Sequence, residues 1–127
     1  MPLKVNVTKK EEGSFVISCL GSIDSLTYTE LEKKLDALLV SSTRVLILNM
    51  EGVDYISSIG VSLVFKTKKA MDEHGGAFIL TNLKPQIKAV FEVVKALPTM
   101  RVFESIEEAD EYLSSIQRKA IEKEKQK

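Results

Sequence analysis

Two adjacent serines, Ser57 and Ser58, precede Ile59 and Gly60 where a loop is expected to become a helix. Serine is a favoured N-cap, because its hydroxyl accepts a hydrogen bond from a free backbone N–H of the first turn. The same position suits a regulatory phosphate, since phosphoserine adds about −1.5 to −2 charges beside the positive end of the helix dipole. Capping and phosphorylation are compatible, and these residues alone leave both interpretations open.

The rest of the chain lacks the residue patterns of an enzyme. It contains no glycine-rich phosphate loop, and its single histidine, His74, is far in sequence from its single cysteine, Cys19. His74 could be a general base, but a polar cap at a helix end is the favoured interpretation. Cys19 is expected to be a small buried strand residue. An aspartate phosphoacceptor would need acidic residues where Asn49 ends the central strand. The sequence therefore predicts a binding module with no catalytic residues, metal or cofactor.

Length and charge restrict the class of partner. The chain has 127 residues, enough for one domain, with 18 basic and 18 acidic side chains. Zero net charge removes the usual argument for binding nucleic acid or an anionic membrane. The first residues form no apolar signal region, no apolar run could span a bilayer, and one cysteine excludes an internal disulfide. We expect a cytoplasmic domain over residues 1–116 and a charged helical extension or tail over residues 117–127.

Hydrophobic periodicity predicts the elements that position the two serines. Strands are predicted over residues 3–7, 15–20, 44–49, 77–81 and 101–103. Apolar stripes at spacings of three and four predict helices over residues 27–40, 58–74, 85–97 and 105–116. Residues 22–25 and 51–56 are expected to be connections. Thr27 with Glu30, and Ser105 with Glu108, have the spacing of a capping box.

The order of these elements predicts an α/β fold. Strands alternate with helices after an N-terminal hairpin, which favours one mixed, mostly parallel sheet that is antiparallel at the hairpin, with about four helices. The strand over 44–49 is almost continuously apolar, as expected when both faces of a sheet are covered. The hairpin edge could pair with a second copy, yet no exposed apolar stripe demands it, so the oligomeric state stays open.

Residues 46–61 resemble the STAS domain of bacterial anti-sigma factor antagonists. The turn Gly21-Ser22-Ile23-Asp24 is similar to the Gly-x-Leu/Ile-Asp turn before that family's first helix. Residues 75–80 and 103–109 are similar as well. Each piece is short, but they follow the family order over roughly residues 3–116. The resemblance implies a single STAS-type domain.

The resemblance also implies a partner-switching function. Such proteins bind a serine-kinase anti-sigma factor, which then releases its sigma factor. The kinase supplies ATP and phosphorylates a serine at the helix start, and a serine phosphatase later resets the antagonist. Aligned on Gly60, that serine is Ser58, and the turn aspartate important for kinase recognition is Asp24. The partner-binding residues so implied are Asp24, Ser22, Ser57, Ser58, Ile59, Gly60 and Ser62.

Two residues depart from the motif Asp-Ser-Ser/Thr-Gly of the sporulation-type members. Ser57 stands where the motif has aspartate, which removes a charge that could steer the kinase. Ile59 replaces the residue after the modified serine and makes the loop more apolar. The missing aspartate leaves an alternative, a non-phosphorylated STAS scaffold subunit of a larger signalling or lipid-transport complex.

Overall fold

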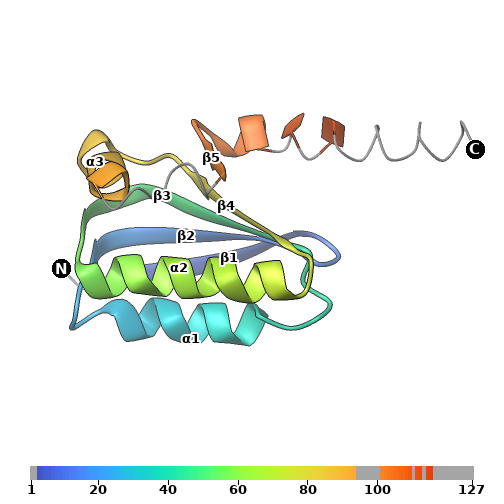
Figure 1. Cartoon of the computed structure of the whole chain (residues 1–127), viewed down its shortest axis with the longest axis horizontal. Helices are drawn as coiled ribbons and strands as arrows, with labels where there is room; N and C mark the ends of the chain where they lie inside the picture. Colours follow the sequence, from blue (N-terminus) through green and yellow to red (C-terminus); the bar gives the residue numbers. More distant parts are fainter. Residues whose placement is uncertain (1–2, 94–100, 110, 113, 116–127) are drawn as a thin grey trace, which may run out of the picture.

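The computed structural model describes residues 3–93, 101–109, 111–112 and 114–115 (Figure 1). The strands are β1 (Lys4–Glu11), β2 (Ser14–Ile23), β3 (Val45–Ile56), β4 (Ala77–Thr81) and β5 (Arg101–Phe103). The helices are α1 (Tyr28–Leu38), α2 (Ser58–Glu73) and α3 (Pro85–Val93), and residues 106–109, 111–112 and 114–115 are also helical. The predicted tail over 117–127 and the predicted end of the third helix at 94–97 lie outside the described residues. No helix in the described ranges is long and apolar enough to cross a membrane.

The five strands form one sheet in the order β1-β2-β3-β4-β5. β1 pairs antiparallel with β2, and every other neighbouring pair is parallel. This confirms the predicted mixed, mostly parallel sheet with its N-terminal hairpin. Because β2, β3 and β4 run in the same direction, the segments that follow them leave from one edge of the sheet.

The predicted connections at 51–56 and 22–23 are wrong, because both are parts of paired strands. β3 continues to Ile56, and its last residues pair with the end of β2, from Leu20 opposite Gly52 to Ile23 opposite Ile56. The register shifts twice between these strands, once between Ser18 and Leu20 and once between Gly21 and Ser22. Gly52 permits the close approach, since a Cβ there would lie 2.7 Å from the backbone oxygen of Cys19. The extended pair carries the end of β2 and the start of α2 to the same place.

The helices cover the sheet unequally. α1, α2 and α3 contribute buried residues such as Leu35, Val64 and Phe91 to a large core cluster on one face. Alternate strand residues point to the opposite face, where Ile47 belongs to a smaller cluster with Ala109 of the last helical segment. These two clusters bury both faces of the central strand, as the apolar run of β3 predicts.

The single cysteine and the single histidine both have structural roles. Cys19 is buried in the larger core cluster, as predicted, and burial raises the pKa of its thiol to about 12. The thiol is therefore protonated and unreactive near neutral pH. His74 is the C-cap residue of α2, and its Nε2 lies 3.0 Å from the carbonyl oxygen of Thr43. This position agrees with the predicted polar cap.

Candidate functional site

The start of α2 is fixed to the end of β2 by backbone hydrogen bonds. Ser57 is the N-cap residue, with an extended backbone at φ −89° and ψ 173°. Its N–H donates to the carbonyl oxygen of Ile23 at 2.8 Å, and its own carbonyl accepts from the N–H of Val61 at 3.0 Å. The first bond ties the serine pair to β2, and the second begins the helix.

The predicted side-chain cap at the start of α2 is absent. Ser57 makes no side-chain capping bond; instead its Oγ is buried and has no hydrogen-bond partner. The first turn of α2 also contains no acidic residue. The first N–H groups of a helix have no acceptor within the helix. The N-terminus of α2 therefore has neither a side-chain capping bond from Ser57 nor an acidic residue in its first turn.

Ser58 is the exposed member of the serine pair. It is the first residue of α2, and its side chain faces solvent, whereas the Ser57 hydroxyl is enclosed. A phosphate on Ser58 would lie beside the free N–H groups of the first turn, where the helix dipole favours negative charge. Of the two adjacent serines, Ser58 is therefore the one exposed to solvent.

Gly60 allows the first turn of α2 to sit against the ends of both neighbouring strands. A Cβ at this position would lie 2.7 Å from Cγ1 of Ile56, at the end of β3. It would also lie 2.8 Å from Cγ2 of Ile23, at the end of β2. Both isoleucines are buried, so neither side chain can move away into solvent.

Replacing Gly60 with alanine is expected to lower the free energy of unfolding by about 1–2 kcal/mol, because the added methyl group overpacks a filled site. Urea denaturation monitored by circular dichroism would measure the change. The control is Ser62→Ala on the exposed face of the same helix, where a change within about 0.5 kcal/mol is expected. Equal stability of the Gly60→Ala and wild-type proteins would contradict this account of the packing.

Asp24 organises the turn between β2 and α1. Its Oδ1 accepts from the N–H of Leu26 at 2.9 Å and from the N–H of Thr27 at 3.1 Å. The Leu26 N–H, supported by the bonds from Thr27, holds the pKa of the Asp24 carboxyl below its usual range, although partial burial opposes this shift. The carboxylate is thus ionised at neutral pH, and this oxygen is engaged by its own turn.

The predicted capping box of Thr27 with Glu30 is wrong. The Thr27 hydroxyl donates to the carbonyl oxygen of Ser22 at 2.7 Å and accepts from the N–H of Asp24 at 3.0 Å. It therefore closes the turn before the helix and makes no capping bond to α1. In the second predicted capping box, one of the two expected hydrogen bonds is observed: the N–H of Glu108 donates to Oγ of Ser105 at 3.1 Å.

The predicted partner-binding residues differ in exposure: Ser58 and Ser62 are exposed, whereas Gly60 and the Ser57 hydroxyl are buried. Ser22 lies at the end of β2, where its Oγ donates to Oδ1 of Asp54 at 3.2 Å, and Asp24 follows in the turn. Ile59 and Ser62 line a pocket of about 250 Å³, together with α1 and α2 residues Tyr28, Glu32, Leu63 and Lys66. The pocket therefore lies between α1 and the first half of α2, and it includes Ile59, the residue after Ser58.

Two exposed apolar residues at this edge were not singled out by the sequence analysis. Leu26, in the turn before α1, is 88% exposed, and Tyr55, near the end of β3, is 55% exposed. Neither residue belongs to a buried stripe. The sequence signal for Leu26 is a single leucine between a predicted strand and a predicted helix, and hydrophobic periodicity does not reveal whether such a residue is buried or exposed.

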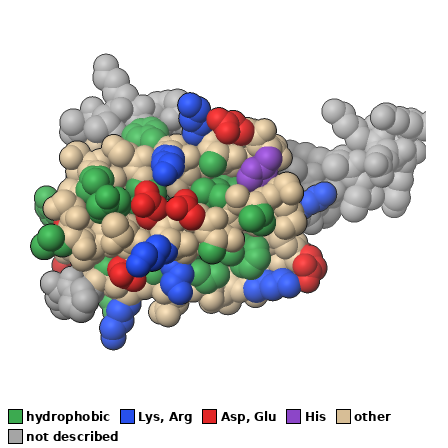
Figure 2. Space-filling view, turned by 90° about the horizontal axis from the view of Figure 1, so that it is seen from below, with side chains coloured by type: hydrophobic (Ala, Val, Ile, Leu, Met, Phe, Trp, Pro, Cys, Tyr) green, Lys and Arg blue, Asp and Glu red, His purple; other side chains and the backbone are tan. Residues whose placement is uncertain are grey.

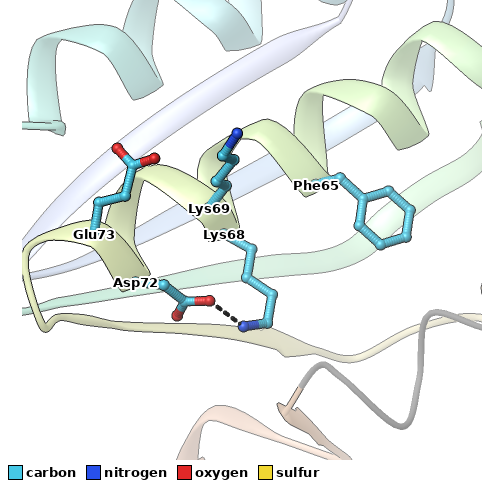
Figure 3. A pocket seen from close by; sticks show the side chains of 5 residues that line it. All are labelled: Phe65, Lys68, Lys69, Asp72 and Glu73. Atoms are coloured by element: carbon cyan, nitrogen blue, oxygen red, sulfur yellow. Dashed lines mark hydrogen bonds and ion pairs between the residues drawn. The ribbon is translucent and has the colours of Figure 1, made fainter.

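A second pocket, of about 560 Å³, lies along the other half of α2 (Figure 3). Phe65 and Lys68 line it, and Lys68 forms an ion pair with Asp72 at 2.6 Å. Lys66 lies 3.6 Å from Glu32 of α1. Figure 2 shows the face of α1 and α2, where charged side chains of both signs are interspersed with hydrophobic ones. These lysines therefore lie on a helix face of mixed charge, where Lys66 and Lys68 each have an acidic neighbour.

Comparison with known proteins assigns the family. A model of the STAS domain matches residues 6–109. The putative anti-sigma factor antagonist BtrV of Bordetella bronchiseptica is 31% identical over 106 residues, which cover 83% of this chain and 91% of that protein. The anti-sigma-B factor antagonist of Staphylococcus aureus is 27% identical over 107 residues, which cover 84% of this chain and 98% of that protein.

Solved structures share the same fold. The anti-sigma factor antagonist SpoIIAA in its unphosphorylated form has a TM-score of 0.77 and 22% identity, covering 88% of this chain and 97% of that one. The phosphorylated form of SpoIIAA from Bacillus has a TM-score of 0.70 and 22% identity, covering 87% of this chain and 99% of that one. Together with the match over residues 6–109, these likenesses agree with the resemblance of residues 46–61. The chain therefore belongs to the STAS domain family.

Proposed function

We propose that this protein is an anti-sigma factor antagonist that binds a serine-kinase anti-sigma factor and thereby frees a sigma factor. Phosphorylation of Ser58 would switch it off. The observation that carries this proposal is the exposed Ser58 hydroxyl at the first residue of α2, beside a positive helix end without a side-chain cap. The names of the relatives from Bordetella bronchiseptica and Staphylococcus aureus support the antagonist role.

In this proposal the chain supplies an acceptor hydroxyl and a docking surface. The kinase transfers the γ-phosphoryl group of its ATP to Oγ of Ser58, which leaves ADP and releases the hydroxyl proton. The kinase brings the nucleotide and Mg²⁺, so the antagonist needs no cofactor of its own. SpoIIAA supports such a modification, since its structure is known in a phosphorylated form.

A phosphate on Ser58 would be compatible with the free protein but would oppose binding of the partner. Near α2 it lies beside free N–H groups and the positive end of the dipole. In a complex it would place about −1.5 to −2 charges at the contact, where the partner would have to desolvate them. Release of the anti-sigma factor follows, and a serine phosphatase acting in the same cytoplasm would restore the antagonist.

The direct test is phosphate transfer with purified components. Each serine-kinase anti-sigma factor encoded in the source genome is incubated with this protein and radiolabelled ATP. We expect one phosphate per chain, abolished in Ser58→Ala and retained in Ser57→Ala, because the Ser57 Oγ is buried. Intact-mass spectrometry and fragmentation would locate the group.

Two results would contradict the proposed switch. Label retained in Ser58→Ala would place the modification elsewhere. Stable binding of a kinase without any transfer would instead favour the alternative, a non-phosphorylated STAS scaffold subunit. This alternative is supported by Ser57, which lacks the charge of the aspartate that sporulation-type members have at this position.

A further inference from the structure

We propose that Leu26 is an apolar anchor that enters a pocket of the partner, and that Asp24 is the positioning residue that holds it in place. The inference rests on the proposed function, because the occupant of this surface is the same anti-sigma factor. It assigns to Leu26 a role in binding, and to Asp24 the role of fixing the turn without contacting the partner.

Leu26 is presented to solvent on a rigid turn. Its side chain is 88% exposed, while its own N–H donates to Oδ1 of Asp24 at 2.9 Å. Thr27 fixes the other side of the turn through its bonds to Ser22 and Asp24. Because the backbone is already held, burying Leu26 against a partner costs little further ordering, which is the condition for an efficient anchor.

The charge of the surrounding surface defines the kind of pocket that fits. Two of the three segments at this edge, residues 17–30 and 49–60, contain four carboxylates and no lysine or arginine, whereas the segment after β4 carries Lys84 and Lys88. The carboxylates are Asp24, Glu30, Glu51 and Asp54. Tyr55 adds a second exposed apolar side chain at the same edge. We therefore assign the occupant as an apolar pocket of the anti-sigma factor, with lysine or arginine side chains on the part of its rim that meets the carboxylates other than Asp24.

The hydrogen bonds of Asp24 separate a positioning role from a charge role. Its Oδ1 accepts from the N–H groups of Leu26 and Thr27 within the turn. An asparagine keeps an acceptor oxygen at this position but removes the charge, whereas an alanine removes both. If Asp24 acts by holding Leu26, asparagine preserves binding and alanine does not.

The test measures affinity for the kinase that binds the wild-type protein, by isothermal titration calorimetry in the absence of ATP. We expect Leu26→Ser and Asp24→Ala each to weaken binding at least tenfold, and Asp24→Asn to stay within about threefold of wild type. The matched control is Val40→Ser, a residue that is 49% exposed just beyond the other end of α1, with no change expected. Melting temperatures of Leu26→Ser and wild type should agree within about 2 °C, because the leucine is exposed.

The outcomes distinguish this inference from the proposed function. If no kinase binds the wild-type protein, the proposed function fails first. If the wild type binds and Leu26→Ser binds equally well, the anchor is wrong while the antagonist role stands. A tenfold loss in Asp24→Asn, with Leu26→Ser also weakened, would show that the charge of Asp24 itself contacts the partner and would overturn its positioning role.

Discussion

Replacing Ser58 with aspartate is expected to weaken the complex with the serine-kinase anti-sigma factor by about 100-fold, which is about 2.7 kcal/mol. Ser58 is exposed and stands at the first residue of α2, within the proposed contact. A carboxylate there is compatible with the free protein, because it faces the positive end of a helix. In the complex the same carboxylate must be desolvated, and that cost appears as a faster dissociation rate.

The controls separate charge from size and position. Asparagine has nearly the volume of aspartate but carries no charge, and we expect the Ser58→Asn protein to bind within about fivefold of wild type. Ser62→Asp places the charge one turn along the exposed face of α2, and the comparison maps how far the contact extends. Surface plasmon resonance gives both rates. Unchanged affinity for Ser58→Asp would remove Ser58 from the contact, and equal weakening by asparagine would make the effect steric.

Local pattern was sufficient to predict the central strand and the end of the second helix. The continuous apolar run Val45 to Leu48 requires cover on both faces, and it forms the first four residues of β3, the middle strand of the sheet. α2 ends before Gly75, whose φ of +76° lies in the left-handed region that favours glycine. Each of these features depends on residues close together in the chain, which is why a sequence can reveal it.

Features that depend on distant residues were not predictable in the same way. Gly52 and two carboxylates between residues 51 and 56 are turn signals, yet this segment pairs with the end of β2. The Ser57 hydroxyl has the type and spacing of a cap, but the tertiary structure buries it. Leu26 is exposed on a turn that the Asp24 carboxylate closes, and hydrophobic periodicity gives no information about the residues of such a turn.

Stability of the site depends on the central strand that leads into it, and Leu48→Ala tests this dependence. Leu48 is fully buried in the larger core cluster, and it lies between Ile17 of β2 and Leu80 of β4 in the sheet. Truncating it leaves a cavity that neighbours on two strands cannot fill, so the free energy of unfolding should fall by about 2–5 kcal/mol.

Such a loss is a large fraction of the roughly 5–15 kcal/mol that stabilises a domain of this size. Urea denaturation would measure it, with Leu20→Ala as the matched control, because Leu20 is 51% exposed on the neighbouring strand and should change stability by less than about 1 kcal/mol. If the two substitutions cost the same, the core assignment of β3 is wrong. If Leu48→Ala is strongly destabilised yet binds its kinase normally at low temperature, the docking surface depends on the turn at Asp24 and the start of α2 rather than on the rigidity of the sheet beneath them.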